Sequence, residues 1–209
     1  MPDLSEELAG LVKYVHGRGW SEGTGGNYSA VIQSDPLRLL ITPSGVDKGQ
    51  VCRDDFLIVD QSGAKIKGEG APSAETLLHV TLVTTMGARV VLHSHSVNQT
   101  LASLSGGDSF QLSNLEMLKG LSGVKTHMHT ESVPILDNSQ HIPELAKELE
   151  ARLVQDPKIH GVLLRGHGLY TWGCDMFEAK RHLEVLEFLF EVTLKAASMG
   201  LTNGSPPRP

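Results

Sequence analysis

The sequence predicts an α/β sandwich in which helices cover one β-sheet. Two observations lead to this prediction. Short apolar runs separated by turn sequences fill the first third of the 209-residue chain, as in β-hairpins. Further along, strand-like runs alternate with longer segments of helical periodicity. The length and the 40% hydrophobic content suit one domain. We expect this domain to span residues 1–200, followed by a disordered Gly/Pro-rich tail at 201–209.

The first part of the chain is expected to contain two helices and four strands. Leucine and valine recur at helical spacing after Asp3, and Gly17 and Gly19 end that helix. Turn sequences separate the strands that follow. Ser73 is the predicted N-cap of the second helix, with Glu75 in its first turn, where negative charge suits the helix dipole. The predicted elements are a helix over 3–17, strands over 28–33, 37–41, 56–60 and 64–67, and a helix over 73–86.

The remainder of the chain is expected to alternate strands with helices. Strands are the short apolar runs bounded by turns, and helices are the longer segments with charges on one face. Neither an internal repeat nor a linker divides this part. The predicted elements are strands over 89–93, 132–136 and 159–164, and helices over 97–104, 114–121, 143–155 and 176–197.

The composition argues against several classes of function. A formal charge of -6 and a pI near 5.9 do not suit a protein that binds nucleic acid or an anionic membrane. Cys52 and Cys174 lie far apart, so neither a disulfide framework nor a thiolate zinc site is indicated. No apolar stretch reaches the length of a membrane span, and the N-terminus is acidic where a signal peptide would be basic. We therefore expect a cytoplasmic protein.

Three histidines carry the strongest chemical signal. His93 and His95 stand at the end of an apolar run, and alternate residues of a strand point to the same face. Both imidazoles can therefore aim at one point. His167 follows a second apolar run between two glycines, which leave room for a ligand. If the third imidazole converges there, the site has three nitrogen ligands and an open fourth position, as catalytic divalent metals require.

The other histidines are interpreted as structural or surface residues. His127 and His129 form a competing pair, but their flanks are polar and loop-like, whereas a pre-organised site is better placed on rigid elements. We expect them on the surface or at the rim of a pocket. The remaining histidines are expected to be hydrogen-bonded core or surface residues: His16, His79, His141, His160 and His182.

A glycine-rich segment over residues 21–29 is a candidate anion site. Its closely spaced glycines let backbone N–H groups line a concave surface, and Thr24 and Asn27 add side-chain donors. It matches neither the P-loop nor the dinucleotide fingerprint, and a plain helix-to-strand connection is the simpler interpretation. Lys48 would add a point charge, although an exposed lysine in a turn is equally ordinary. Further candidate contacts are Ser44, Gly45 and Ser73.

Glu75 and Glu116 are the candidate acid–base groups. Both lie in weakly charged surroundings near predicted buried elements. Apolar neighbours of Glu116 are expected to raise its pKa toward a useful range. The alternative for each is a solvated surface or helix-cap carboxylate.

Five of these stretches occur in an order that resembles the class II aldolase/adducin family. Several motifs in order are more specific than any one of them, and the resemblance covers residues 8–197. The stretches are Gly23-Thr24-Gly25-Gly26-Asn27-Tyr28-Ser29, Thr42-Pro43-Ser44-Gly45, Pro72-Ser73-Ala74-Glu75, His93-Ser94-His95 and Gly166-His167-Gly168.

The resemblance implies a three-layer α/β/α sandwich around a mainly antiparallel sheet. It implies one Zn²⁺ per subunit, held by His93, His95 and His167. It also implies a homotetramer with active sites near subunit interfaces. The implied phosphate site consists of Thr24, Gly26, Asn27, Ser44, Gly45 and Ser73, with Lys48 as a further candidate.

Within the family, the stretches 42–49, 114–120 and 165–173 favour a zinc-dependent dehydratase of methionine salvage. Its implied reaction converts 5-methylthioribulose 1-phosphate to 5-methylthio-2,3-dioxopentyl phosphate. Glu116 falls where such dehydratases carry their proposed acid/base and is our preferred group. Glu75 falls where sugar-phosphate aldolases carry theirs. The alternatives are an aldolase or epimerase acting on a sugar phosphate and a metal-free module such as the adducin head, which has no physical reason to keep three histidines.

Overall fold

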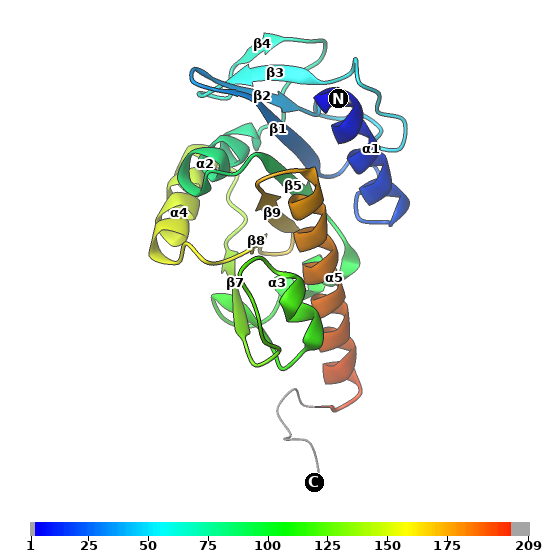
Figure 1. Cartoon of the computed structure of the whole chain (residues 1–209), viewed down its shortest axis with the longest axis vertical. Helices are drawn as coiled ribbons and strands as arrows, with labels where there is room; N and C mark the ends of the chain where they lie inside the picture. Colours follow the sequence, from blue (N-terminus) through cyan, green and yellow to red (C-terminus); the bar gives the residue numbers. More distant parts are fainter. Residues whose placement is uncertain (1–2, 202–209) are drawn as a thin grey trace.

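A nine-stranded sheet forms the centre of the computed structural model, which describes residues 3–201 (Figure 1). Its order is β4-β3-β2-β1-β5-β9-β8-β7-β6, and every neighbouring pair is antiparallel except β7 with β8. The expected tail, apart from Leu201, lies outside the described residues. The strands are β1 (Asn27–Ser34), β2 (Leu37–Ile41), β3 (Leu57–Asp60), β4 (Lys65–Lys67), β5 (Val90–Ser94), β6 (Ser109–Ser113), β7 (Thr130–Leu136), β8 (Gly161–Leu164) and β9 (Leu169–Gly173).

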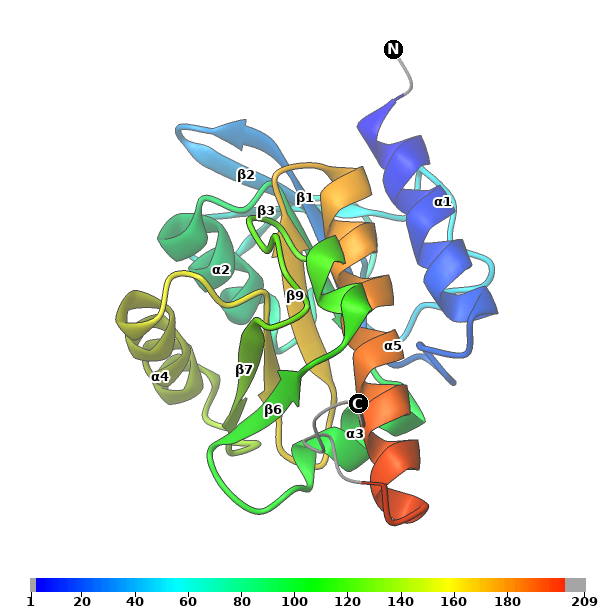
Figure 2. The same cartoon turned by 60° about the horizontal axis from the view of Figure 1, so that its bottom comes forward.

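Helices cover both faces of the sheet, so the predicted three-layer sandwich is confirmed (Figure 2). On one face lie α2 (Thr76–Met86) and α4 (Ile142–Gln155), which pack on each other and on the sheet. The other face carries α1 (Leu4–Gly17), α3 (Val97–Ser103) and α5 (Met176–Ser198). Within residues 3–201, no helix is both long and apolar enough to cross a lipid bilayer.

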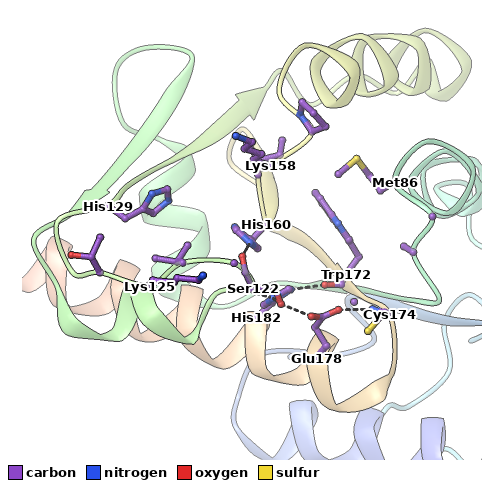
Figure 3. Close-up of a pocket in the computed structure, with 18 residues that line it drawn as sticks. Met86, Ser122, Lys125, His129, Lys158, His160, Trp172, Cys174, Glu178 and His182 are labelled. Carbon is purple, nitrogen blue, oxygen red and sulfur yellow. Dashed lines mark hydrogen bonds between the residues drawn. The ribbon is translucent and has the colours of Figure 1, made fainter.

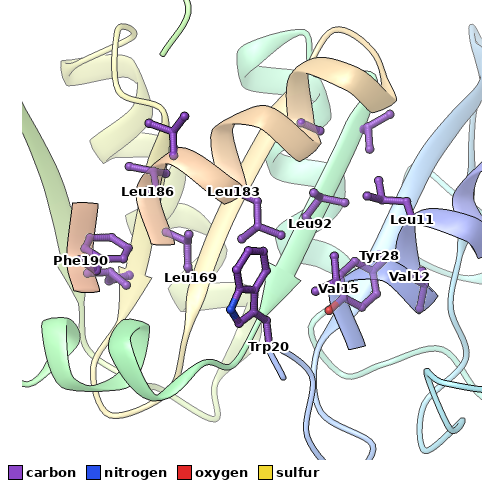
Figure 4. Close-up of a cluster of buried hydrophobic side chains, with 14 of the residues drawn as sticks. Leu11, Val12, Val15, Trp20, Tyr28, Leu92, Leu169, Leu183, Leu186 and Phe190 are labelled. Atoms are coloured by element: carbon purple, nitrogen blue, oxygen red, sulfur yellow. The ribbon is translucent and has the colours of Figure 1, made fainter. Parts of the chain in front are cut away.

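The larger hydrophobic core fixes the two strands at the middle of the sheet. Leu183 and Phe190 of α5 are fully buried in one cluster with Leu92 of β5 and Leu169 of β9 (Figure 4). Burial of each such side chain contributes about 1.5–3 kcal/mol relative to leaving it exposed. Close packing of this kind leaves β5 and β9 little freedom to shift, which makes them a rigid support for side chains at their ends.

Two strands, β6 and β9, lie where no element was predicted. The omission of β9 matters more, because it pairs with both β5 and β8. Its aromatic and β-branched residues, Tyr170, Thr171 and Trp172, are typical of strands. It follows β8 after only four residues, however, which hides the boundary between two separate strands.

Two predicted helices differ from the observed structure. The N-cap prediction for Ser73 is wrong, because α2 begins at Thr76 with Glu75 as its N-cap. Instead, the Ser73 carbonyl accepts from the Thr76 N–H and its hydroxyl accepts from the Glu75 N–H, at 3.1 and 3.2 Å. This turn brings Ser73 and Glu75 to the end of the helix. The predicted helix over 114–121 is the shorter 3₁₀ turn η1 (Glu116–Gly120).

Candidate metal centre

The three predicted histidines converge at one end of the central strands. His93 is on β5, His95 follows that strand, and His167 lies in the tight turn between β8 and β9. The Nε2 atom of His93 is 2.8 Å from Nε2 of His95 and 3.4 Å from Nε2 of His167. Among residues 3–201 these three form the one group of possible metal ligands whose donor atoms lie within 4.8 Å of one another.

The imidazoles are oriented as metal ligands need to be. Nδ1 of His93 donates to the carbonyl of Leu169 at 3.1 Å, and Nδ1 of His167 faces Oδ1 of Asn138 at 3.3 Å. Because those protons are on Nδ1, the Nε2 lone pairs of His93 and His167 point into the space between the three imidazoles. Metal-bound histidines usually have such a hydrogen bond on the ring nitrogen that does not bind the metal. Tetrahedral zinc with bonds of about 2.0–2.1 Å places neighbouring nitrogens about 3.3 Å apart. The donor set therefore fits a divalent cation of this kind.

Burial keeps the imidazoles of His93 and His95 neutral, which is the form that binds metal. Removal from water, and then the neighbouring His95 and His167, hold the pKa of His93 well below its ordinary value. Burial likewise lowers the pKa of His95 to about 4, helped by His167 and by the charge of Lys48. The lone pairs of His93 and His95 are therefore available at neutral pH without competition from protons.

The glycine-rich segment lies directly against this centre. Gly26 has φ +76°, and a Cβ there would lie 2.6 Å from the His93 carbonyl oxygen. Only glycine allows this backbone to approach β5 so closely. The next residue, Asn27, begins β1 and pairs with His93. The pairing of β1 with β5 therefore fixes the position of the glycine-rich loop relative to His93.

The other phosphate candidates gather around the same loop. Lys48 is only 1% exposed, contrary to the alternative of a solvated turn residue, and its Nζ donates to the carbonyls of Thr24 and Val46 at 2.9 and 3.1 Å. The Asn27 side chain donates to the Ser73 hydroxyl at 3.1 Å. The segment containing the exposed Ser44 and Gly45 is held beside them, through the hydrogen bond from the Ser44 N–H to the Ala71 carbonyl and the bridge between Pro43 and Pro72.

The structure separates the two candidate carboxylates. Glu75 lies at the histidines, with its Oε2 3.5 Å from His93 Nε2 and its Oε1 3.7 Å from His167 Nδ1. Its side chain is 17% exposed. Asn27 donates to Glu75 Oε2 at 3.0 Å. Glu75 is thus the carboxylate that this chain itself supplies to the centre.

Glu116 lies elsewhere, on η1, with its side chain 71% exposed. It pairs with Lys119 at 2.5 Å and with His127 at 3.7 Å. The hydrogen bond from Lys119, and then its charge, lower the pKa of Glu116. The expectation that apolar neighbours raise this pKa is therefore wrong for the chain by itself, because solvent and a lysine surround the carboxylate.

The chain matches a known family over most of its length. The profile of the Class II Aldolase and Adducin N-terminal domain matches residues 6–194. The chain belongs to the class II aldolase and adducin family. Methylthioribulose-1-phosphate dehydratase from Pseudomonas aeruginosa is 44% identical over 200 residues, covering 94% of this chain and 96% of the relative. The enzyme of the same name from Pseudomonas fluorescens is also 44% identical and covers 94% of each chain.

Solved structures of class II aldolases share the fold. An L-fuculose 1-phosphate aldolase superimposes with a TM-score of 0.79 at 22% identity, covering 99% of this chain and 92% of that one. The L-fuculose-1-phosphate aldolase from Thermus thermophilus gives a TM-score of 0.75 at 23% identity, covering 95% and 98%. Class II aldolases generally use a divalent metal, and the histidine triplet of this chain offers such a site.

A separate cavity of about 770 Å³ lies at the opposite end of β8 and β9 (Figure 3). His129 and His160 line it, and none of the three converging histidines does. The five residues of β9 separate the two ends by about 13 Å at an ordinary strand rise. The pairing of Ser113 with Thr130 places the segment leading to Glu116 at the cavity end as well. His129 thus sits at a pocket rim, as expected, and His127 is exposed beside Glu116.

Two residues of this site are absent from the sequence predictions. Tyr170 stacks on the His93 ring, with centroids 4.0 Å apart and planes 9° apart. Burial, and then the charge of Glu75, raise its pKa well above the ordinary value. Asn138 faces His167 from the segment after β7. Both depend on tertiary pairing, Tyr170 on β9 in particular, which local sequence patterns do not encode.

Proposed function

We propose that this chain is a methylthioribulose-1-phosphate dehydratase, a hydro-lyase of methionine salvage. It would convert 5-methylthioribulose 1-phosphate to 5-methylthio-2,3-dioxopentyl phosphate and water. The main structural observation in support of this proposal is the set of three converging imidazoles with the carboxylate of Glu75 beside it. The 44% identity to dehydratases of that name, over nearly the whole of both chains, selects this reaction among those of the family.

His93, His95 and His167 would hold one zinc ion, since three imidazoles with an open fourth position suit catalytic zinc. When bound, the ion would supply Lewis acidity toward the substrate carbonyl at carbon 2, which would make the proton on carbon 3 more acidic. The chain's own groups must then fix the substrate and move that proton.

The phosphate group would bind in the loop formed by residues 24–27, 44–45, 48 and 73. Lys48 adds positive charge, and Ser73 presents a hydroxyl. Contacts to the phosphate are remote from the bonds that change. Their free energy therefore goes into orientation of carbon 3 and carbon 4 at the histidines.

A carboxylate would take the proton from carbon 3 and return it to the hydroxyl that leaves carbon 4 as water. The enol that remains then becomes the 2,3-diketone. Glu75 is in place for this within the chain, whereas Glu116 is at the far end of β8 and β9. We propose that a neighbouring copy of the chain supplies Glu116, in keeping with a homotetramer whose sites lie near subunit interfaces.

Mixed oligomers test that part of the proposal. Glu116→Gln and His95→Ala chains would each be inactive alone. If Glu116 acts across the interface, mixing them equally restores about a quarter of the sites, because half keep their histidines and half of those face an intact Glu116. A mixture that stays inactive, with mixed oligomers verified by mass, would place Glu116 in its own chain's site. A Glu116→Gln chain that is active alone would place Glu116 outside catalysis. Glu75→Gln tested singly shows whether the local carboxylate is required.

A sugar-phosphate aldolase is the second candidate, since Glu75, which falls where such aldolases carry their acid/base, is the carboxylate at the histidines. Incubation with 5-methylthioribulose 1-phosphate and, separately, with fuculose 1-phosphate distinguishes the two. Diketone absorbance from the first substrate supports the dehydratase. An aldehyde product from the second, with no diketone from the first, would refute it.

A further inference from the structure

His79 is a buried histidine that the proposed chemistry does not use. It lies on α2, is fully buried, and belongs to no group of metal ligands among residues 3–201. Its Nε2 faces Oδ1 of Asn27 in a short hydrogen bond, and its Nδ1 is 2.8 Å from the Ser29 hydroxyl. Its ring and that of Tyr170 pack edge to face. Each polar atom of His79 therefore has one defined partner.

The chemistry of these partners gives the hydrogen-bond chain a direction. Burial lowers the pKa of His79 to about 3, so the ring is neutral, with one nitrogen donating and one accepting. The amide oxygen of Asn27 can only accept, so the His79 proton must be on Nε2. Nδ1 then accepts from the Ser29 hydroxyl. With its oxygen engaged, the Asn27 amide turns its NH₂ group the other way.

That NH₂ group joins the two halves of the proposed active site. Nδ2 of Asn27 donates to Ser73 Oγ at 3.1 Å and to Glu75 Oε2 at 3.0 Å. A carboxylate oxygen accepts hydrogen bonds, so the contact of Asn27 with Glu75 requires the same amide orientation as its contact with His79. The Glu75 oxygen held in this way is the one that lies 3.5 Å from His93 Nε2.

The same arrangement leaves the Ser73 hydroxyl as a donor. Its oxygen accepts from Asn27 Nδ2 and from the Glu75 N–H, at 3.1 and 3.2 Å. The hydrogen bonds within residues 3–201 include no protein acceptor for its own proton. Ser73 lies half-buried beside the glycine-rich loop, so this proton is available to an anion there.

We propose that His79 is a positioning residue. Its Nε2–H fixes the Asn27 amide so that Ser73 donates to the substrate phosphate while Glu75 stays beside the metal-binding histidines. This inference rests on the proposed function, because it assumes that a phosphate group occupies the loop. If the amide were free to flip, Asn27 would present its oxygen to the Glu75 carboxylate, and both contacts would be lost.

A pair of substitutions separates this role from simple packing. His79→Gln can place an NH₂ donor near the position of Nε2, whereas His79→Met keeps a side chain of similar length without a donor. The probe is glycerol 1-phosphate, titrated calorimetrically into the zinc-loaded protein. Acetohydroxamate, which binds zinc and carries no phosphate, is the control probe. Zinc content and thermal stability are measured for each variant.

We expect His79→Met to weaken glycerol 1-phosphate binding about 5- to 10-fold, the size of one ordinary hydrogen bond. His79→Gln should bind within about twofold of wild type, and both should bind acetohydroxamate and zinc normally. A folded His79→Met protein with wild-type affinity for glycerol 1-phosphate overturns the inference, as does a Gln variant as weak as Met. If His79→Met does not fold, Ser29→Ala replaces it, with a two- to threefold loss expected and wild-type affinity again contradicting the role.

Failure of the wild-type protein to bind glycerol 1-phosphate would be a different result. It would show that the proposed phosphate site is wrong, and the role of His79 would fall with it. If the protein forms the diketone but does not bind glycerol 1-phosphate, the dehydratase reaction stands, and the phosphate site and the role of His79 are both wrong.

Discussion

Gly168→Ala tests the close approach of the β8–β9 turn to β5, on which the convergence of the histidines depends. A Cβ at Gly168 would lie 2.2 Å from the Ser94 carbonyl oxygen and 2.8 Å from Cδ2 of His95. Ordinary contact begins near 3.4 Å. The backbone must therefore separate by about 1 Å, whereas a metal site tolerates about 0.2 Å in its bonds. The turn that carries His167 would move away from His95.

We expect Gly168→Ala to bind zinc far below one ion per chain and to lose dehydratase activity with it. Overpacking of this kind costs about 1–3 kcal/mol, which lowers the melting temperature by about 2–12 °C in a chain of this size. Metal analysis after desalting and a thermal melt are the assays. Gly166→Ala, in the same turn, is the matched control. It has φ +64°, but its Cβ would meet only Leu104 at 3.7 Å, so it should be strained yet keep its zinc.

A Gly168→Ala protein with full zinc content and an unchanged melting temperature would contradict this geometry. The turn would then accommodate a Cβ at position 168 without moving away from β5, contrary to the distances above. Equal loss of zinc in Gly168→Ala and Gly166→Ala would instead mean that backbone strain, rather than contact with β5, controls the site.

Three further predictions concern the metal, a buried ion pair and the anion loop. Removal of zinc by a chelator should lower the melting temperature by about 8–16 °C when the free ion had been at 1,000 times its Kd, and added zinc should restore it; an unchanged melt would argue against a resident ion. Glu131→Gln should cost about 1–3 kcal/mol because Glu131, 3% exposed, accepts from both the N–H and Nδ1 of His160 at 3.0 Å. Burial raises the pKa of Glu131, but the hydrogen bond and charge of His160 outweigh it and lower the pKa, while the same contact outweighs burial and raises that of His160. The stability that Glu131 contributes is lost as pH falls through its lowered pKa, and the stability that His160 contributes is lost as pH rises through its raised pKa. The melting temperatures of wild type and Glu131→Gln should therefore differ most between about pH 4.5 and 6.5, and less at pH 8. A difference independent of pH would refute the pairing. Lys48→Met should leave the Thr24 and Val46 carbonyls unpaired and weaken glycerol 1-phosphate binding about tenfold, measured by calorimetry, whereas normal binding would exclude Lys48 from the phosphate site.

Much of the metal centre follows from local sequence pattern. Residues two apart on a strand share a face, so the pairing of His93 with His95 needs only the strand that precedes them. The apolar run before His167 likewise predicts β8. β8 is held near β5 only through β9, which lies between them and pairs with both, and this strand was not predicted.

The carboxylates show where sequence reasoning stops. Glu116 has apolar neighbours in the chain, yet η1 turns its side chain into solvent beside Lys119. Ser73 has the residue type of an N-cap, but its hydroxyl serves Asn27 and the turn before α2. The exposure of Glu116 and the contact between Ser73 and Asn27 come from the tertiary fold, and spacing along the chain does not contain them. Only the pairing of Glu116 with Lys119, three residues away, is local.

The position of His167, 74 residues beyond His93, gives the ion a mechanical consequence. Everything from α3 to β8 lies between these two ligands, including η1 with Glu116. A cation that bonds to both ends closes this segment into a loop, and closing a long loop restricts the unfolded chain more than closing a short one. Loss of an ion held there would thus lower the free energy of unfolding as well as stop the reaction, so depletion of metal would expose this enzyme to proteolysis.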